Sequence, residues 1–263
     1  MKKMTKIISL LLAVAMMAAM LVACGSKESE ETTEETTESA EAIKFGTNAE
    51  FPPFEFVAQE GVIGEFDGID MAIAKQIAEE NGMTAEIENM EFDSLIVALQ
   101  NGQIDAVIAG MTVTEERAEA VDFSTPYYTA TQVMVVKEGS DIAKAADMEG
   151  KEIRVIQGYT GETCVSEMGY EYEAFKKGTE AVMELVNGKC DVVVIDSATA
   201  QKYVSDNEGL VIVEDPEAFA SEEYAIAVQK GNTELLDKIN AAIEKMLEDG
   251  TVSELAAKYT DAE

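Results

Sequence analysis

The chain has 263 residues, 47% of them hydrophobic, which is enough to bury the cores of two modest lobes. Aspartate and glutamate number 52 against 19 lysines and arginines, and the resulting net charge of -33 argues against nucleic acid as a partner, because phosphates demand a basic surface. The chain contains no histidine, which excludes a Ser-His-Asp triad, a Cys-His pair and a histidine-ligated zinc site.

Residues 1–23 have the pattern of an export signal. Lys2, Lys3 and Lys6 precede the apolar run IISLLLAVAMMAAMLVA, as a charged n-region precedes an h-region. The run ends in LVACGS, which resembles the lipobox of a bacterial lipoprotein signal and implies cleavage before Cys24 and lipidation of its sulfur. The alternative is an uncleaved transmembrane anchor, for which the run is short.

Residues 24–42 are predicted to form an acidic tether behind the lipidated cysteine. Serine, threonine and glutamate dominate GSKESEETTEETTESAEA, and no large apolar residue occurs in it. Such a segment cannot bury a core and repels itself, so we expect a disordered spacer. An acidic interaction tail is the alternative.

From residue 43 the chain alternates between strand and helix patterns. The predicted elements are a strand IKFGT at 43–47, a helix GIDMAIAKQIAEENG at 68–82, a strand AEIENM at 85–90, a helix DSLIVALQNG at 93–102 and a buried strand IDAVIAG at 104–110. Isoleucines spaced four apart mark the apolar face of the first helix, and Asp93 or Ser94 is the expected N-cap of the second. This β-α-β-α-β order is typical of a parallel sheet.

A second series of the same kind covers residues 151–204. Its elements are KEIRVIQG, TGETCVSEMG, YEYEAF, TEAVMELVNG, CDVVVID and SATAQKYV. The segments LQNGQIDAVIAG and LVNGKCDVVVID match, with Asn101 and Asn187, and likewise Asp105 and Asp191, separated by the same 86 positions. We therefore expect two similar lobes.

The connections between the lobes are expected to be extended. The chain would leave the first lobe through DFSTPYYTATQVMVV and return through SEEYAIAVQ, after which the helices NTELLDKINAAIEKMLEDG and VSELAAKY complete the first lobe. The predicted division is residues 43–127 plus 225–263 for lobe 1, and 128–224 for lobe 2 with a hinge strand at each end.

The ends of the two matched strands are the expected place for a ligand. Gly110 and Asp196 each stand five residues beyond the matched aspartate, where a parallel strand ends. Ligands of open α/β sheets bind outside the carboxyl ends of the strands. Two facing lobes would therefore place the segment Gly110–Arg117 opposite Asp196.

The chain has only two arginines, and Arg117 follows a motif that favours an anion site. Thr114 is a plausible N-cap for EERAEAV, so free helix N–H groups and a guanidinium would suit a carboxylate. Asp196 would hold a cation, although it could also serve only as a helix N-cap, and Arg117 could be a solvated surface residue. A carboxylate with an ammonium is an α-amino acid. Arg154 falls on the outward phase of its strand and is expected to lie outside the site.

Two further segments are predicted at the cleft. Phe51 and Phe92 follow strands and would be pocket walls or core, and Pro52 and Pro53 are expected to hold their loop extended. In IQGYTGET, the backbone of Thr160 and Gly161 would present N–H groups at a helix start, although an ordinary βα-loop has the same pattern.

Several blocks together resemble the polar amino-acid solute-binding proteins of ABC importers, over roughly residues 43–260. They are FGTNAEFPPFEF, MEFDSLIVALQNGQIDAVIAGMTVTEERAEAVDFSTPYY, IQGYTGE, DVVVIDS and NAAIEKMLEDGTVSELAAKY, of which GMTVTEER is the most specific. The resemblance implies a two-lobed α/β fold of the type II periplasmic-binding-protein kind. Each lobe is expected to be a mainly parallel sheet flanked by helices, with a two-strand hinge.

The resemblance also implies roles for single residues. Arg117 would grip the α-carboxylate, helped by Thr112 and the Thr160–Gly161 backbone. Asp196 and the Gly110 carbonyl would take the α-ammonium, and Phe51 and Phe92 would sandwich the side chain.

One departure bears on the choice of ligand. Asn48 stands where members that bind cationic amino acids often carry aspartate, and Ile195 beside Asp196 is apolar. Glu50 lies near enough in sequence to substitute. The pattern leaves the amino acid open, with a lean towards neutral polar ones.

The function implied is capture of a free amino acid and its delivery to the transmembrane subunits of an ABC permease. The protein would be a monomer anchored through its lipid to the outer face of the cytoplasmic membrane, with no cofactor, no metal and no chemistry on the ligand. Two alternatives stay open: a dehydratase-like enzyme on the same scaffold, for which Glu50 is the candidate acid, and a surface adhesin.

Overall fold

The structure, a computed structural model, describes residues 41–260. The predicted signal peptide, Cys24 and nearly all of the acidic tether lie outside the described residues. Within 41–260, no helix combines the length and the apolar character needed to cross a membrane.

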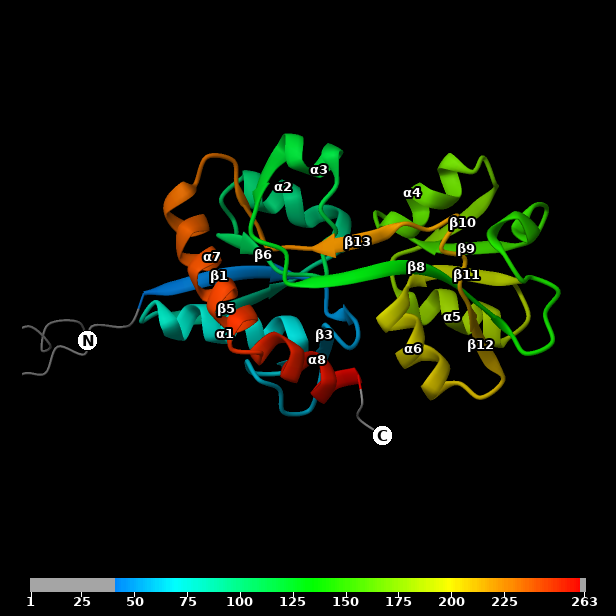
Figure 1. Ribbon diagram of the computed structural model, residues 1–263, viewed down its shortest axis with the longest axis horizontal. Coiled ribbons are helices and arrows are strands. Elements are labelled where there is room, and N and C mark those ends of the chain that lie inside the picture. The colour runs from blue at the N-terminus through cyan, green and yellow to red at the C-terminus, as the bar shows by residue number, and fades with distance from the viewer. Residues whose placement is uncertain (1–40, 261–263) are drawn as a thin grey trace, which may run out of the picture. The chain divides into compact units, whose positions relative to one another are not determined.

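The first lobe is built on a five-stranded sheet (Figure 1). Its strands, in spatial order, are β5 (Thr84–Asn89), β1 (Ala42–Thr47), β6 (Ala106–Val107), β14 (Ala227–Gln229) and β7 (Val121–Phe123). β5, β1 and β6 are parallel, whereas β14 is antiparallel to both of its neighbours. The sheet is therefore mixed, and its parallel half is the one that the β-α-β-α-β pattern predicts.

The second lobe repeats this plan. The strand order is β10 (Tyr172–Phe175), β9 (Ile153–Ile156), β11 (Val192–Asp196), β8 (Tyr128–Lys137) and β12 (Leu210–Val213). β10, β9 and β11 are parallel, and β8 is antiparallel to β11 and β12. The predicted two-lobed α/β fold of the type II binding-protein kind is confirmed. Each sheet is mixed, however, and not mainly parallel as expected, because the strands that arrive from the other lobe, β14 in the first sheet and β8 in the second, are antiparallel to their neighbours.

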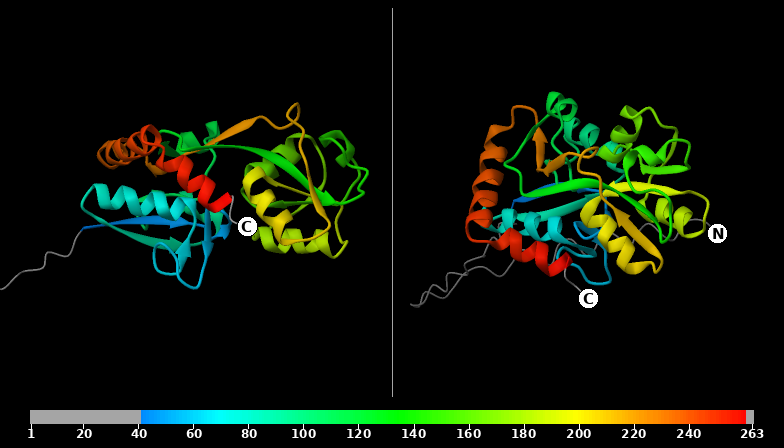
Figure 2. Two further views of the ribbon diagram at one scale, coloured as in Figure 1. Left: turned by 60° about the horizontal axis from the view of Figure 1, so that its bottom comes forward. Right: turned by 45° about the vertical axis from the view of Figure 1, so that its right-hand side comes forward.

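Two antiparallel strands connect the sheets. β8 continues from the first sheet towards the second, and β13 (Ser221–Tyr224) pairs with its first half, from Tyr128 opposite Tyr224 to Thr131 opposite Ser221. Figures 1 and 2 show the two running side by side. Both segments lie in the stretches in which the sequence predicts extended connections.

The helices cover the faces of the two sheets. The first lobe carries α1 (Ile69–Glu80), α2 (Leu95–Gln100), α3 (Glu115–Ala120), α7 (Thr233–Glu248) and α8 (Thr251–Thr260), and the second carries α4 (Thr160–Glu167), α5 (Gly178–Val186) and α6 (Ser197–Asp206). The isoleucines that predicted the face of α1 are fully buried, and α1 packs against α7 and α8. A 3-10 turn, Phe92–Ser94, precedes α2. Ser94 takes the N-cap position of α2, but its side chain makes no cap hydrogen bond.

The matched aspartates have the same role in both lobes. The Asp105 carboxylate accepts from the Lys44 amide at 2.8 Å, and the Asp105 amide donates to the Lys44 carbonyl at 2.8 Å. The Asp191 carboxylate accepts from the Glu152 amide at 2.8 Å, and its own amide donates to the Glu152 carbonyl at 2.9 Å. Each aspartate thus joins the start of its strand to the start of the neighbouring strand, so the sequence echo reflects a repeated structural unit.

The loop with two prolines differs from its predicted form. β2 (Glu50–Phe51) and β3 (Glu55–Val57) form a hairpin in a small sheet with β4 (Phe66–Asp67), and Pro52 and Pro53 lie in its turn. The chain there reverses its direction instead of staying extended. Phe51 and Phe54 are both fully buried beside this turn.

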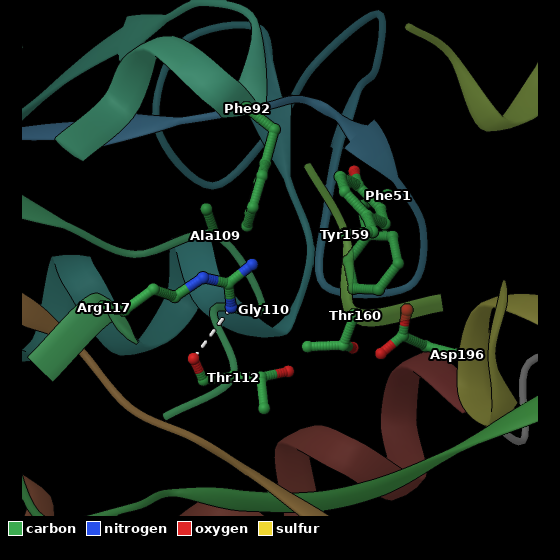
Figure 3. A pocket seen from close by; sticks show the side chains of 9 residues that line it. All are labelled: Phe51, Phe92, Ala109, Gly110, Thr112, Arg117, Tyr159, Thr160 and Asp196. Carbon is green, nitrogen blue, oxygen red and sulfur yellow. Dashed lines mark hydrogen bonds between the residues drawn. The ribbon is translucent and has the colours of Figure 1, made fainter. Parts of the chain in front are cut away.

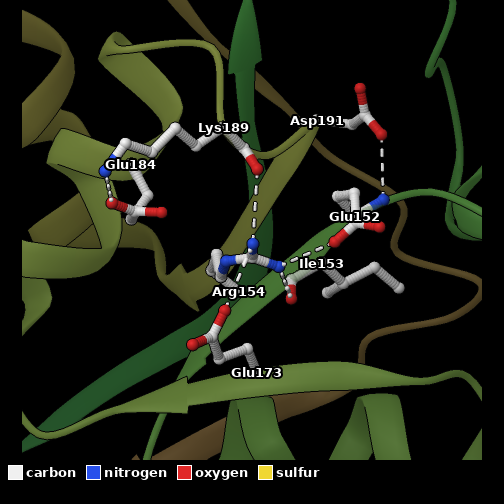
Figure 4. A network of polar contacts seen from close by, with 7 residues as sticks. All are labelled: Glu152, Ile153, Arg154, Glu173, Glu184, Lys189 and Asp191. Atoms are coloured by element: carbon white, nitrogen blue, oxygen red, sulfur yellow. Dashed lines mark hydrogen bonds and ion pairs between the residues drawn. The ribbon is translucent and has the colours of Figure 1, made fainter.

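Arg154 is buried, so the prediction that it faces outward was wrong. Its side chain donates to the Glu152 carboxylate and to the carbonyls of Ile153 and Lys189, and it pairs with Glu173 at 3.2 Å (Figure 4). The reason is that α4 and α5 pack on β9, which leaves every residue of that strand buried. The network lies where β9 and β11 begin, whereas Asp196 is the last residue of β11, so the two are at opposite ends of the strands.

Candidate ligand-binding site

One small cavity brings together most of the residues that the sequence singles out (Figure 3). Its volume is about 10 Å³, room for roughly one water molecule. It is lined by Phe51, Phe92, Ala109, Gly110, Thr112, Arg117, Tyr159, Thr160 and Asp196. Of the predicted residues only Asn48 and Gly161 are not in the lining, and both contact residues around it.

Arg117 is held by main-chain carbonyls of both lobes. Nη1 donates to the Thr112 carbonyl at 2.8 Å and Nη2 to the Gly158 carbonyl at 2.9 Å, and the guanidinium carbon lies 5.1 Å from the centre of the Phe92 ring. Burial lowers the pKa of Arg117, and the carboxylates of Asp196 and Glu222 oppose that shift. A guanidinium has five N–H donors, so these two bonds leave others for a ligand anion.

The helix that carries Arg117 is short, but its N-cap is the one predicted. Thr114 Oγ1 accepts from the Arg117 amide at 3.1 Å. α3 buries none of its residues, so this bond and the carbonyl contacts of the guanidinium hold the side chain in place. The Arg117 amide is thus engaged within its own helix and is not available to an anion.

Asp196 lies across the cavity from Arg117, with Thr112 and Thr160 between them (Figure 3). It is the last residue of β11, and only 3% of its surface is exposed. Burial raises its pKa to about 7, the nearby Glu222 carboxylate adds to the rise, and hydrogen bonds from Tyr224 and Gln132 reduce it. A cation at this position would meet a buried carboxyl group.

Gly110 is fixed by a buried pair of acids. Its amide donates to Asp70 Oδ2 at 2.8 Å, and the Tyr127 hydroxyl donates to the same oxygen at 2.8 Å. Burial raises the pKa of Asp70 to about 6 and that of Glu55, which faces it, well above its usual range. In the described residues no hydrogen-bond donor reaches either oxygen of Glu55 or the second oxygen of Asp70, and the nearby Asp70 adds to the rise in the pKa of Glu55.

Only glycine fits at position 110. Its φ is 51°, and a Cβ there would lie 2.5 Å from the Phe51 ring. Gly161 is constrained in a similar way, since a Cβ would lie 2.7 Å from Gln132 Oε1 and 3.0 Å from the Val194 carbonyl oxygen. Both glycines thus allow the close packing that brings the loops to the cavity.

The ring of Tyr159 lies against both phenylalanines. Its centre is 5.2 Å from that of Phe51 and 4.6 Å from that of Phe92, in edge-to-face geometry in both cases. Its hydroxyl donates to Asn48 Oδ1 at 3.1 Å, while Asn48 Nδ2 donates to the Met90 carbonyl at 2.9 Å. The space that the two phenylalanines were expected to enclose for a ligand is thus bordered by a protein side chain.

Two threonine hydroxyls of the cavity are hydrogen-bonded to a glutamate of a connecting strand. Thr112 Oγ1 donates to Glu222 Oε2 at 2.9 Å, and Thr160 Oγ1 donates to the same oxygen at 2.7 Å. Gln132 of β8 donates to Thr160 Oγ1 at 3.0 Å and to Glu222 at 3.4 Å. A carboxylate therefore already engages the side chains of Thr112 and Thr160, the two threonines that are expected near the carboxylate of a ligand.

A larger cavity of about 910 Å³ adjoins the small one. Phe92, Thr112, Arg117 and Thr160 line both, and the larger cavity extends over α3, α4 and the β13 segment Ser221–Glu223. Arg117 and its partners therefore form the wall between the two spaces.

Glu50 does not face the cavity as a free acid. Its carboxylate pairs with Lys177 at 2.7 Å, which joins the hairpin of the first lobe to the start of α5 in the second. In residues 41–260, no group of three or more histidine, cysteine, aspartate or glutamate side chains is arranged to hold a metal ion.

Sequence reasoning missed Tyr159, Glu222, Gln132 and the pair of Asp70 and Glu55. Tyr159 stands inside the loop IQGYTGET, so its place before Thr160 was a usable signal. A carboxylate in a predicted hinge strand, as in SEEYAIAVQ, was the signal for Glu222, and an aspartate on the apolar face of α1 was the signal for Asp70.

Comparison with known proteins gives a consistent result. The family profile of bacterial extracellular solute-binding proteins, family 3, matches residues 43–262. The arginine-binding extracellular protein of Bacillus subtilis is 33% identical over 258 residues, covering 97% of this chain and 98% of that protein. A glutamine-binding protein of an ABC transporter from the same organism is 34% identical over 270 residues, covering 97% of each.

Solved structures agree in fold. An ancestral arginine-binding protein bound to glutamine is 45% identical and aligns with a TM-score of 0.77, over 83% of this chain and 97% of its own. An ancestral amino acid-binding protein described as a precursor of cyclohexadienyl dehydratase is 34% identical, with a TM-score of 0.77 over 83% of this chain and 95% of its own.

Proposed function

Because the chain belongs to the bacterial extracellular solute-binding proteins of family 3, we propose that it captures a free α-amino acid outside the cell and delivers it to an ABC permease. The relatives named for arginine and glutamine support the class of ligand. No reaction on the ligand is part of this proposal.

The observation that carries the proposal is the placement of one cation and one anion in the same cavity. Arg117 would bind the α-carboxylate, with the Thr112 side chain and the Thr160–Gly161 backbone as further donors. Asp196 and the Gly110 carbonyl would bind the α-ammonium. A zwitterion that bridges these groups would have both charges paired in a site where burial makes an unpaired charge costly.

The cavity volume requires movement during binding. A volume of about 10 Å³ does not hold an amino acid. The two lobes would therefore open and close again around the ligand, with β8 and β13 as the connection between them. Arg117 is well placed to respond, because its bond to Gly158 joins the lobes.

The side chain of the ligand would lie among Asn48, Phe51, Phe92 and Tyr159. Asn48 and the Tyr159 hydroxyl are neutral hydrogen-bonding groups, and Glu50 is engaged by Lys177. These contacts support a neutral polar amino acid such as glutamine in preference to a cationic one.

A thermal-shift screen of the twenty amino acids tests the proposal first, since a ligand that binds only the folded state raises the melting temperature. Calorimetric titration of the selected amino acid with Arg117→Ala and Asp196→Ala follows. Leaving one ligand charge buried without a partner is expected to lower affinity about 100- to 4,000-fold. Binding within a few-fold of the unchanged protein by a folded Arg117→Ala variant would refute this site.

We also propose that Cys24 is lipidated and holds the protein at the outer face of the cytoplasmic membrane. The LVAC motif supports this, and a diacylglyceryl group supplies the two chains that stable anchoring needs. Cell fractionation of a Cys24→Ser variant is the test. If the variant stays with the membrane like the unchanged protein, the anchor is not this lipid.

The alternative of an enzyme is tested by incubation with prephenate or arogenate and detection of an aromatic product. The ancestral binding protein related to a dehydratase is the reason to make this measurement. We expect no product, because the candidate acid Glu50 is engaged by Lys177.

A further inference from the structure

Glu222 places a protein carboxylate at the Thr112 hydroxyl, which the proposed function gives to the ligand, and at the hydroxyl of Thr160, whose backbone it gives to the ligand. It lies on β13, one of the two connecting strands, and is partly buried. Its Oε2 accepts from Thr112 at 2.9 Å, from Thr160 at 2.7 Å and from Gln132 at 3.4 Å. The two threonines belong to different lobes, and both line the cavity between Arg117 and Asp196.

The number of hydrogens decides what these hydroxyls can do. A threonine hydroxyl has one hydrogen, and an ionised carboxylate only accepts hydrogen bonds. A hydroxyl that donates to Glu222 therefore cannot donate to the carboxylate of a ligand at the same time. For Thr160 the direction is further fixed, because Gln132 Nε2 donates to its oxygen.

The negative charge of Glu222 also disfavours the binding of a ligand carboxylate. Its carboxylate interacts favourably with Arg117 and unfavourably with Asp196, so it lies within electrostatic reach of both. A ligand carboxylate that enters beside Arg117 would meet a like charge there. A neutral group in the same place would not be repelled, and an amide NH₂ could donate to Glu222.

We propose that Glu222 is a specificity-determining residue of the ligand site, a resident carboxylate that competes with the ligand's α-carboxylate for Thr112, Thr160 and Arg117. This rests on the proposed function. Glu222 weakens the binding of an amino acid. It also reduces the factor by which the site prefers an α-carboxylate to an α-carboxamide. The affinity of the protein is therefore set below what its donors alone would provide.

The test compares two variants with a matched control. Glu222→Ala removes the competing group, and Glu222→Gln keeps its shape while replacing an acceptor by an amide that can donate. Glu223→Ala is the control, because Glu223 is the next residue of β13 with an exposed side chain, and only its carbonyl bonds to Val113. The probes are L-glutamine, L-arginine and their α-carboxamides, titrated calorimetrically into the full chain.

For the amino acids, Glu222→Ala is expected to raise affinity about tenfold or more, the value of one hydrogen bond to a charged group. The carboxamides should gain nothing, and Glu223→Ala should match the unchanged protein. Glu222→Gln should show a gain in the same direction, which keeps the test valid if the alanine variant folds poorly.

Three outcomes would overturn the inference. If the unchanged protein binds an amino acid and neither Glu222 variant binds it more tightly, Glu222 does not compete. If carboxylates and carboxamides gain equally, Glu222 acts on the stability of the site and not on its specificity. If the unchanged protein binds none of the probes and none of the twenty amino acids, the proposed function fails, and this inference fails with it.

Discussion

Asp196 is a residue at which burial and a neighbouring charge act in the same direction. Its surroundings are the carboxylate of Glu222, the hydroxyl of Tyr224, the amide of Gln132 and, across the cavity, Arg117. With a pKa of about 7, it binds a proton in the neutral to weakly acidic range in which an ordinary aspartate is ionised.

The first prediction is that amino-acid affinity depends on pH through Asp196. An α-ammonium requires the ionised carboxylate, so binding below pH 7 must release the proton that Asp196 holds. Relative to its value at slightly alkaline pH, where the ligand's α-ammonium is still protonated, affinity should fall by about tenfold per pH unit below pH 7, the limit for one released proton. Calorimetric titration in two buffers of different ionisation enthalpy measures the number of protons that are released on binding. Affinity that stays constant from pH 8 to pH 5.5 would contradict the prediction.

Tyr159 leads to a second prediction, about the size of the ligand side chain. Tyr159→Ala should open the space beside Phe51 and Phe92, so amino acids with larger side chains should give greater thermal shifts than with the unchanged protein. Tyr172→Ala, at an exposed tyrosine of β10, is the control. An unchanged ranking of the twenty amino acids in the Tyr159 variant would show that this ring does not limit the site.

The third prediction is that replacing Arg154 lowers stability and spares affinity, whereas replacing Arg117 lowers affinity and spares stability. Arg154→Ala removes a buried side chain together with the hydrogen bonds that it donates to the Ile153 and Lys189 carbonyls, so the melting temperature should fall while amino-acid affinity stays within a few-fold. Arg117→Ala should lose affinity and keep most of its stability. Differential scanning calorimetry and titration of both variants measure this, and a large affinity loss in folded Arg154→Ala would contradict it.

At the scale of elements, α3 is a short helix whose position depends on its cap. It buries no residue, so tertiary packing does little to hold it, and the bond from the Arg117 amide to Thr114 is its main local constraint. The orientation of Arg117 should therefore depend on this hydroxyl.

The fourth prediction follows from that cap. Thr114→Ala removes about 1 kcal/mol from the helix end, which corresponds to a loss of affinity of up to about fivefold, with little change in melting temperature. Thr114→Ser keeps the cap and should restore the affinity. Equal affinities for the alanine and serine variants would show that the cap does not position Arg117.

The elements were predictable because their signals are local. The isoleucine spacing of α1, the Asn-Gly ends of α2 and α5 and the cap at Thr114 each occupy a few consecutive residues. Strand β6 was expected to be longer, but beyond Val107 the Ile108 amide still donates to the Gly46 carbonyl, so the extended chain continues.

The missed parts of the site depend on contacts between distant segments. Tyr159 and Asn48 are 111 positions apart, and Thr112 and Glu222 are 110 apart. The sequence placed Gly110 and Asp196 because they end matched strands, and Arg117 because it follows the cap motif at Thr114, whereas Glu222 carries no such mark on β13. The burial of Arg154 was unpredictable for the same reason, since the helices that cover β9 are separate segments.

At the scale of the whole described chain, a few polar contacts join the lobes beside the connecting strands. Arg117 bonds to Gly158 at 2.9 Å, Gln157 to Asp93 at 3.0 Å and Lys177 to Glu50 at 2.7 Å. Solvent weakens these partly exposed contacts, so each is expected to contribute little to holding the lobes together.

The fifth prediction is that Lys177→Glu favours separated lobes. The change places two carboxylates where an ion pair now joins Glu50 to α5, and the small contribution of the other contacts makes the balance sensitive to it. Small-angle X-ray scattering without added amino acid should show a larger radius of gyration than for the unchanged protein. Lys202→Glu, which breaks a pair within α6, is the control. Identical scattering curves for Lys177→Glu and Lys202→Glu would contradict the prediction.

The strand order also has a consequence for how the chain acquires its structure. β14 pairs with β6 and β7, although the whole sequence of the second sheet lies between them, whereas β8 to β12 form one continuous stretch. A chain that emerges from its N-terminus can therefore complete the second sheet before the first, which must wait for its last strand and for α7. Pulsed hydrogen exchange during refolding would reveal this sequence of events, with amides of β9 and β11 protected before those of β14. A chain delivered across a membrane in an extended form would, on this basis, begin its maturation from the middle.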